Sequence, residues 1–459
     1  MKTYFVPKRL IQSLSNNKML VSFLLIAFVL RIAGFIIYLK TGGTGIEPDT
    51  ESYLIPAISM KTNFQFGNSA FRTPGYPFLL MVVMSVFGES FYYGLVAIQI
   101  LLNMIAIFYV YKICLLLTQK EQIGYIAVAI ASLNFLDILY CYQILTDSVA
   151  QSVMVISVYY FLCYLKSLKQ GKSTVKNPVI ASVFLTFSVF IRPATVYLPY
   201  AIMIGLIFAS IIYKRYKHIL LIFMCITLLI NTPVMLWINR NERVVGFDGY
   251  STVSSVNMYT YNAAAVYAKQ NEMSYYDALS ILQSEEDPIL QEYMQTMSPY
   301  DAYSHRGWEI ISSDFPYYLQ CCLKDCIYLT IYPGAMSLDF VSEGISDLVT
   351  QIKDSAEISV GDFFRNKEGV LSFCILGINV LALVVIFVFA VLGLLILMKK
   401  DWLQASFLAG ILLYNYVAMC QPMGIGTFAR FRLSFSMILC LCAAYGLYIA
   451  FQKTKQRKA

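Results

Sequence analysis

The sequence predicts an all-α integral membrane protein: a bundle of about ten transmembrane helices with interfacial helices and a large external loop. Three observations support this prediction. The chain is 58% hydrophobic and only 13% charged, whereas a soluble protein has roughly 25% charged residues. Successive apolar runs reach or approach the length of about 20 residues that crosses a bilayer. Charge is also distributed unevenly along the chain, which fixes the orientation of the bundle.

The apolar runs come in two groups, separated by a long polar region. The first run contains Arg31 and is not followed by a small-residue cleavage site, so we expect a retained helix or an uncleaved signal anchor. The expected spans cover residues 19–39, 91–117, 123–141, 146–165, 178–191, 195–213, 218–238, 371–398, 402–421 and 427–451, and the fifth of them is short.

Basic residues mark one side of this bundle. All the basic clusters fall on the cytoplasmic side if both termini are cytoplasmic, as the positive-inside rule requires. These clusters are Lys2, Lys8 and Arg9; Lys166, Lys169, Lys172 and Lys176; Lys214, Arg215 and Lys217; Lys399 and Lys400; and Lys453, Lys455, Arg457 and Lys458.

The polar region 239–370 then falls on the external side. It contains 19 acidic and 8 basic residues, a formal charge of −11, although the whole chain carries +7. We therefore expect three parts. Residues 1–238 form an N-terminal transmembrane module whose first external loop carries Asp49, residues 239–370 an external loop or small helical region, and residues 371–459 the C-terminal transmembrane helices.

One further apolar segment, "PGYPFLLMVVMSVFG" at residues 74–88, is short for a span. If it crossed the membrane, every later basic cluster would move to the external side, against the positive-inside rule. We therefore expect a half-inserted or interfacial helix on the external face.

Acidic residues are concentrated beside the first span, where "GIEPDTESYLIPA" places Glu47, Asp49 and Glu51 within five residues. Charges at membrane depth are costly, so they mark functional candidates. The predicted topology brings six such residues toward the external surface: Asp49, Arg72, Asp147, Arg192, Arg430 and Arg432.

Carboxylates and arginines under the outer leaflet suit one chemistry in particular. A carboxylate takes a proton from an acceptor hydroxyl or orients it. Arginines hold and neutralise a departing phosphate with paired donors. Because no nucleotide is available outside a bacterial cell, an activated group would arrive there on a lipid carrier.

The motifs around these residues resemble those of the polyprenyl-phosphate-dependent glycosyltransferases with a GT-C fold, a group that includes protein O-mannosyltransferases and lipid A aminoarabinose transferases. "PDTESYLIPA" is similar to the family's acidic residue followed four positions later by tyrosine, here Asp49 and Tyr53. "RTPGYP" at residues 72–77 is similar to its Arg/Lys-Pro-Pro-Gly-Tyr-Pro element and contains Tyr76. The later elements are "LTDSVAQSVMVISVYYFLCYLKS", "FIRPATVYLP" and "GTFARFRLSFSMILCLCAAYGL", with Phe431 where the family has tyrosine.

The resemblance covers about the first two hundred residues and the last span. It implies a GT-C-like bundle and a multi-pass protein of the bacterial inner membrane, with its active site on the external or periplasmic side. The implied reaction moves a hexose or pentose from a polyprenyl-phosphate donor to a glycan, lipid or protein acceptor, with no role for nucleic acid. The implied catalytic residues are Asp49 and Asp147, and the implied donor-phosphate residues are Arg72, Tyr53, Tyr76, Arg192, Arg430 and Arg432.

Each of these residues also has a purely structural interpretation. Asp49 and Asp147 are placed to cap helices, because acids and Thr or Ser near a helix start are good capping chemistry. Arg72 and Arg192 could be arginines whose stems lie in the interface while their charges reach water. Arg430 and Arg432 are two positions apart, so only one of them faces inward on a helix.

No cofactor is certain from the sequence. With only His218 and His305, a histidine-based metal site is not expected. A divalent metal held by Asp49, Asp147 and acids of the external loop stays open. Arg31 and Asp137 are expected to pair structurally or to face the bundle interior.

Two other functions compete with glycosyl transfer. A transporter would also have sparse buried charge, but would show paired repeats and broken helices near the membrane midplane. A polysaccharide polymerase or ligase also uses lipid-linked sugars and a large external loop, and is the closer competitor.

Overall fold

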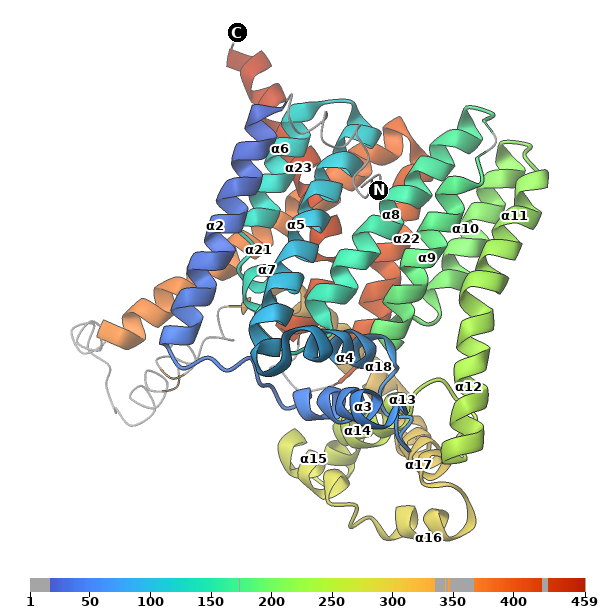
Figure 1. The fold of residues 1–459 in the computed structure, drawn as a ribbon. Helices are drawn as coiled ribbons and strands as arrows, with labels where there is room; N and C mark the ends of the chain where they lie inside the picture. Colours follow the sequence, from blue (N-terminus) through green and yellow to red (C-terminus); the bar gives the residue numbers. More distant parts are fainter. Residues whose placement is uncertain are drawn as a thin grey trace. The chain divides into compact units, whose positions relative to one another are not determined.

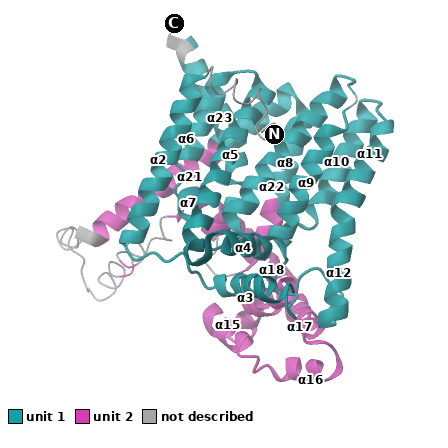
Figure 2. Cartoon of the chain, viewed as in Figure 1, with its two compact units in different colours: residues 1–251, 389–414, 433–459 teal, residues 252–388, 415–432 magenta. Residues whose placement is uncertain are grey.

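The computed structural model describes residues 17–172, 174–334, 367–422 and 428–458, together with positions 343 and 346. These residues contain helices and no strands. The chain divides into two compact units, which we describe separately (Figure 2). Unit 1 comprises residues 1–251, 389–414 and 433–459, and unit 2 comprises residues 252–388 and 415–432.

Unit 1 begins with the helices that carry most of the expected spans (Figure 1). Its first helix starts where the side chain of Asn17 accepts a hydrogen bond from the Leu20 amide, a typical N-cap. The helices are α2 (Lys18–Lys40), α3 (Thr50–Asn63), α4 (Gly75–Phe87), α5 (Phe91–Thr118), α6 (Glu121–Ser132), α7 (Phe135–Leu139), α8 (Asp147–Lys169), α9 (Lys176–Ile191), α10 (Leu198–Ile212), α11 (Lys217–Ile226) and α12 (Thr232–Val245).

Three later helices complete the bundle: α21 (Lys367–Lys400), α22 (Trp402–Met419) and α23 (Phe428–Lys458). Each begins in one unit and ends in the other, so only Phe389 onward in α21, Trp402–Tyr414 in α22 and Leu433 onward in α23 belong to unit 1. Eight of the described helical segments are long and apolar enough to cross a membrane. The protein is therefore a multi-pass membrane protein, as the sequence predicts.

Two of the ten expected spans are not among these eight segments. The run at 178–191, which was expected to be short, forms the 16-residue helix α9. The run at 123–141 is not one helix, because α6 ends after 12 residues and α7 adds only five. Asn134 separates them in an extended conformation, and asparagine competes for backbone hydrogen bonds within helices.

The segment at 74–88 forms α4, which lies across one end of the unit 1 bundle together with α3 (Figure 1). At 1.5 Å per residue its 13 residues extend about 20 Å, which is too short to cross the hydrocarbon core. Gly88 then adopts a positive φ of 55°, a conformation that favours glycine. This turn separates α4 from α5.

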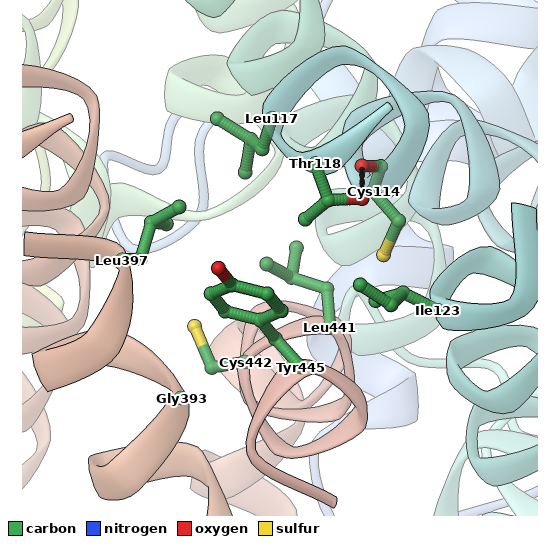
Figure 3. Close-up of a pocket in the computed structure, with 9 residues that line it drawn as sticks. All are labelled: Cys114, Leu117, Thr118, Ile123, Gly393, Leu397, Leu441, Cys442 and Tyr445. Atoms are coloured by element: carbon green, nitrogen blue, oxygen red, sulfur yellow. Dashed lines mark hydrogen bonds between the residues drawn. The ribbon is translucent and has the colours of Figure 1, made fainter. Parts of the chain in front are cut away.

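Close packing of α21 against α23 depends on two glycines of unit 1. A Cβ on Gly393 would lie 1.9 Å from the Cys442 carbonyl oxygen, and one on Gly446 would lie 2.1 Å from that of Phe389. Small residues let membrane helices approach to backbone contact. Beside this contact lies a small apolar cavity (Figure 3), lined by Cys114, Leu117, Thr118, Ile123, Gly393, Leu397, Leu441, Cys442 and Tyr445.

Unit 2 contains the short helices that follow residue 252. They are α13 (Val253–Asn257), α14 (Ala263–Gln270), α15 (Tyr275–Gln283), α16 (Pro288–Thr296), α17 (Pro299–Ser313) and α18 (Phe315–Ile331). Their apolar core includes Tyr259, Ala263, Leu282, Leu290 and Ile310.

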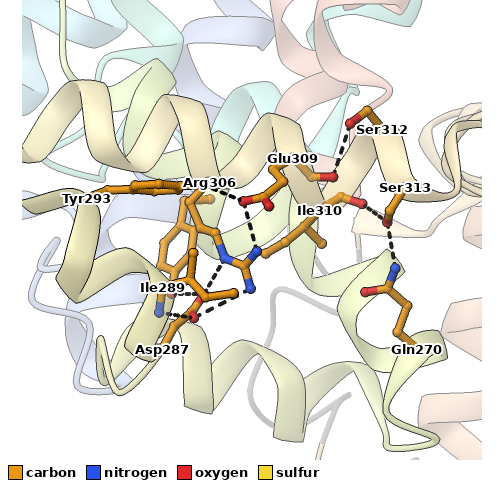
Figure 4. Close-up of polar contacts among 10 residues, drawn as sticks. Gln270, Asp287, Ile289, Tyr293, Arg306, Glu309, Ile310, Ser312 and Ser313 are labelled. Carbon is orange, nitrogen blue, oxygen red and sulfur yellow. Dashed lines mark hydrogen bonds and ion pairs between the residues drawn. The ribbon is translucent and has the colours of Figure 1, made fainter.

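A buried ion pair ties α16 to α17 within this unit. Arg306 donates to Asp287 over 2.7 Å and to Glu309 over 3.0 Å (Figure 4). Asp287 also caps α16 by accepting from the Ile289 amide. Unit 2 therefore has its own polar and apolar core.

Candidate functional site

The central feature of the candidate site is an ion pair between Asp49 and Arg72. Arg72 lies in the connection from α3 to α4, and its Nη2 approaches Asp49 Oδ1 to 2.6 Å. The Arg72 side chain is only 10% exposed, whereas that of Asp49 is 36% exposed. The pair therefore presents a carboxylate to the outside and keeps the guanidinium largely covered.

The contacts of Asp49 bear on whether it caps a helix or serves as a site carboxylate, the two interpretations drawn from the sequence. Asp49 occupies the N-cap position of α3, yet its side chain makes no capping hydrogen bond. Thr50 instead ties the start of the helix, since its hydroxyl accepts from the Glu47 amide and donates to the Ile144 carbonyl. The Asp49 carboxylate is thus directed to Arg72 rather than to the helix end.

Arg72 is held from several directions. Its Nε donates to the Ser52 hydroxyl over 2.8 Å. Its guanidinium carbon lies 4.3 Å from the ring centroid of Tyr53 and 4.7 Å from that of Phe71, distances at which cation–π attraction operates. Nη1 donates no hydrogen bond to the described residues, so Arg72 retains a donor for a ligand.

Tyr53 and Tyr76 lie behind Arg72. Their rings meet edge to face with centroids 5.3 Å apart, and both side chains are buried. The Tyr76 hydroxyl donates to Gln99, whose amide nitrogen donates to the carbonyls of Cys141 and Gln143. Tyr76 is therefore fixed by the interior of the bundle, and its ring packs against that of Tyr53.

A second ion pair joins Asp147, the first residue of α8, to Arg192, which follows α9. The Asp147 side chain is fully buried and that of Arg192 is 10% exposed. Arg192 adopts an extended conformation that ends α9, as expected for a residue that precedes proline. This pair is less accessible to solvent than the Asp49–Arg72 pair, because its carboxylate is fully buried.

The helices that carry the two ion pairs pack against one another. Gly75, at the start of α4, lies so close to the end of α9 that a Cβ there would be 2.5 Å from the Phe190 carbonyl oxygen. One apolar cluster contains Tyr53, Tyr76, Leu145, Val149 and Ile191, and so joins α3, α4, α8 and α9. The structure thus brings together six of the eight predicted site residues: Asp49, Tyr53, Arg72, Tyr76, Asp147 and Arg192.

The other two predicted residues, Arg430 and Arg432, belong to unit 2. Arg432 is buried, and its Nη1 donates to the carbonyls of Leu329 and Tyr332 over 3.0 Å and 2.9 Å. Arg432 therefore caps the carboxyl end of α18, a favourable place for a cation. Arg430 is half-buried.

Two contributors were missed by the sequence interpretation, Ser52 and Gln99. A glutamine inside an apolar run is itself a signal, because a polar group at membrane depth needs a partner. Ser52 had no comparable signal, since a serine one turn into an exposed helix is common.

Arg31 and Asp137 face the interior of unit 1, one of the two structural roles expected for them. Arg31 donates to Asn103 and to the Ala27 and Ser132 carbonyls. Asp137 accepts from the Ser436 hydroxyl at both carboxylate oxygens. These contacts lie outside the two site ion pairs.

The described site residues do not group as a divalent-metal site, and several of the loop acids considered for one, such as Asp339, Asp347 and Asp354, lie outside the described residues. The carboxylates of Asp49 and Asp147 each lie against an arginine, whose positive charge opposes a bound cation. Among the described residues, no three His, Cys, Asp or Glu side chains group as metal ligands.

Comparison with known proteins identifies the class of fold. The chain matches the apo crystal structure of the Archaeoglobus fulgidus oligosaccharyltransferase with a TM-score of 0.55 and 14% identity, over 96% of this chain and 51% of that one. The same enzyme in complex with Zn and sulfate gives 0.52 and 14%, over 96% and 50%. The archaeal oligosaccharyltransferase AglB in complex with an inhibitory peptide and a dolichol-phosphate gives 0.50 and 13%, over 96% and 51%. The fold is therefore GT-C-like, and the chain spans about half the length of these structures.

A sequence family also matches part of the chain. Residues 71–237 match the family model described as dolichyl-phosphate-mannose-protein mannosyltransferase. This segment contains Arg72, Tyr76, Asp147 and Arg192, and the match confirms there the resemblance drawn from the motifs. No curated protein matches the chain by sequence.

Proposed function

We propose that this protein is a membrane glycosyltransferase that moves a sugar from a polyprenyl-phosphate donor to an acceptor hydroxyl on the external face of a bacterial inner membrane. The family match over residues 71–237 and the GT-C-like fold support this class of reaction. The observation that carries the proposal is the Asp49–Arg72 pair, in which an accessible carboxylate lies beside a covered guanidinium.

Arg72 is the proposed phosphate ligand. Its Nη1 donates no hydrogen bond to the described protein residues, and the rings of Tyr53 and Phe71 hold its plane. A guanidinium held in this way neutralises negative charge as it develops on the departing phosphate, without reorganising during the reaction.

Asp49 is the proposed general base, which acts on the hydroxyl of the acceptor. In this reaction the acceptor oxygen forms a bond to the anomeric carbon while the bond from that carbon to the donor phosphate oxygen breaks. The proton of the acceptor hydroxyl passes to the Asp49 carboxylate, and the electron pair of the broken bond leaves with the phosphate. A single direct displacement of this kind inverts the anomeric centre.

Asp147 and Arg192 provide a rigid support. Asp147 is fully buried, so its proposed role is to orient Arg192 rather than to meet the acceptor. Arg192 then supplies a second positive charge near the donor phosphate. Tyr53 and Tyr76 position Arg72, whereas a phosphate role for Arg430 or Arg432 stays a prediction from the family pattern.

Both termini are cytoplasmic in this proposal, and the site faces outward. The basic clusters and the acidic region 239–370 support that orientation through the positive-inside rule. In this proposal Arg72 and Arg192 supply positive charge near the donor phosphate.

The test is the surface-glycan and lipid-linked-sugar profile of cells that lack the gene. These cells are complemented at equal membrane levels with the wild type, with Asp49→Asn, or with the control Glu51→Gln, which removes an exposed acid two residues away. We expect the wild type and Glu51→Gln to restore the glycan, and Asp49→Asn to accumulate a lipid-linked monosaccharide.

Three other results would redirect the proposal. Restoration by Asp49→Asn would remove Asp49 from catalysis. Accumulation of a lipid-linked oligosaccharide would instead favour the polymerase or ligase alternative, a class suggested by the oligosaccharyltransferases of similar fold. An unchanged lipid-linked pool in every strain would favour a transporter.

A further inference from the structure

The connection that carries Arg72 has no regular secondary structure of its own. Residues 64–74, which we call the strap, join α3 to α4. The strap begins with Phe64 at φ 56° and contains Gly67 at φ 89°. Because irregular segments of this kind are the easiest parts of a fold to displace, the position of Arg72 depends on what holds the strap.

Arg240 in the second half of α12 binds the strap, although the two segments are far apart in the sequence. Arg240 donates from Nη1 to the Ser69 carbonyl over 2.8 Å and from Nη2 to the Gly67 carbonyl. Its guanidinium carbon also lies 4.9 Å from the Trp237 ring and 5.3 Å from the Phe66 ring. The two rings meet edge to face 4.9 Å apart, so Arg240 is held by its own helix while it holds the strap.

The turn after α12 adds a third contact. The Ser251 hydroxyl donates to the Phe71 carbonyl over 2.7 Å. The turn is itself tied back to the helix, because Asn241 donates to the carbonyls of Gly249 and Tyr250. The bound carbonyls belong to Gly67, Ser69 and Phe71, which are alternate residues, and Arg72 follows at once.

We infer that Arg240 is a positioning residue that holds the strap in the register where Arg72 meets the donor phosphate. This inference rests on the proposed function, since it gives Arg240 its effect through Arg72. Arg240 lies outside the segment 71–237 that matches the family.

Arg240 acts by ordering the strap rather than by adding charge at the ligand. The Arg240 guanidinium is used by two backbone carbonyls and two rings, so it has little left to offer a ligand. Without it, the strap would sample several conformations and Arg72 would occupy its binding position for a fraction of the time. A ligand's apparent affinity falls by that fraction.

The test measures binding of undecaprenyl phosphate to the full-length protein in detergent. We expect Arg240→Ala to raise the Kd about tenfold and Arg240→Lys, which keeps the charge and a donating nitrogen, to raise it less. The matched control is Arg243→Ala, an exposed arginine on the same helix, which should leave the Kd unchanged. In an Arg72→Ala background, Arg240→Ala should have no further effect, because the residue through which it acts is gone.

Amide hydrogen exchange of residues 65–74 provides a second readout that needs no ligand. Exchange should accelerate in Arg240→Ala and stay unchanged in Arg243→Ala. Unchanged exchange in Arg240→Ala would overturn the inference, as would faster exchange with an unchanged Kd.

The failure of the proposed function has a different signature. If Arg72→Ala leaves the Kd unchanged, or if the wild type does not bind undecaprenyl phosphate, Arg72 is not a phosphate ligand and the positioning role falls with it. The exchange data would then still show whether Arg240 holds the strap. The Arg72→Ala Kd therefore tests the proposed function, and the exchange data test the contact between Arg240 and the strap.

Discussion

Asp49 and Arg72, 23 residues apart and at opposite ends of the α3 region, form a 2.6 Å ion pair that the helix cap of α3 does not require. A capping aspartate would direct its carboxylate to the amides of its own helix. Here the Asp49 side chain makes no such bond, and the Thr50 hydroxyl ties the residues before α3 by accepting from the Glu47 amide. The Asp49 carboxylate is thus oriented by Arg72, and its side chain is 36% exposed.

Replacement of Arg72 should separate binding from stability. Because Asp49 is 36% exposed, loss of the ion pair should cost only about 1 kcal/mol of unfolding free energy. Loss of a preorganised donor at a developing charge should lower turnover by about 100-fold. Arg72→Lys should recover little activity, since lysine cannot contact Ser52 and a phosphate in the same plane.

The measurement is initial rate and thermal unfolding of purified Arg72→Ala and Arg72→Lys in parallel. A large drop in thermal stability with a proportional drop in rate would show that Arg72 is structural.

Asp147 and Arg192 should behave in the opposite way. Removal of one partner from a buried pair leaves an uncompensated charge, which typically costs about 3–5 kcal/mol. Asp147→Leu should therefore lower the unfolding temperature strongly. Because paired apolar replacements are often tolerated, Asp147→Leu combined with Arg192→Leu should recover much of the stability while activity stays low.

A double-mutant cycle on thermal unfolding checks this. Additive losses in the double variant would mean that the two residues do not act as a pair.

The sequence predicted those parts of the molecule that follow from solvent exclusion. Long apolar runs and basic clusters predicted the bundle, because a bilayer admits only helices of sufficient length. The break between α6 and α7 at Asn134 was not predicted, because the mean hydropathy of a long segment changes little when one residue is polar. Charge at membrane depth also predicted Asp49, Arg72, Asp147 and Arg192 as candidates.

Pairing was harder to predict than location. Nothing in the spacing of Asp49 and Arg72 specifies that they meet, because that contact depends on the fold of the strap. The grip of Arg240 on backbone carbonyls leaves no sequence pattern at all, since any residue supplies a carbonyl. The contacts of Arg432 could not be predicted either, because an arginine that binds the carbonyls at the end of α18 looks the same in sequence as an arginine at the membrane interface.

Gly393 should be intolerant of any side chain. Its Cβ position lies 1.9 Å from the backbone oxygen of Cys442, and a backbone atom cannot move aside as a flexible side chain can. Gly393→Ala should destabilise the packing of α21 on α23 by about 1–3 kcal/mol, the usual range for overpacking. Gly410→Ala is the matched control, since nothing lies within 4 Å of its Cβ position. Equal unfolding temperatures for the two variants would contradict the close contact.

Asp325 should make the stability of unit 2 depend on pH. Its side chain is buried on α18, and burial raises its pKa from 3.8 to about 6, with only Lys324 opposing. Between about pH 4 and pH 6 the folded state therefore holds a proton that the unfolded state releases. Stability is highest below that window and is lost as the pH rises through it.

Asp325→Asn removes the titrating group, so the variant should unfold at a higher temperature than the wild type above pH 6, and the difference should vanish near pH 4. Asp314→Asn is a control of opposite sign, because hydrogen bonds from Lys269 and the Tyr317 amide lower the pKa of Asp314. That variant should be less stable than the wild type at neutral pH, and its deficit should fade as the pH falls. The measurement is thermal unfolding of the full-length protein from pH 4 to pH 8, and a parallel shift of both variants with pH would rule out the assignment to these carboxyls.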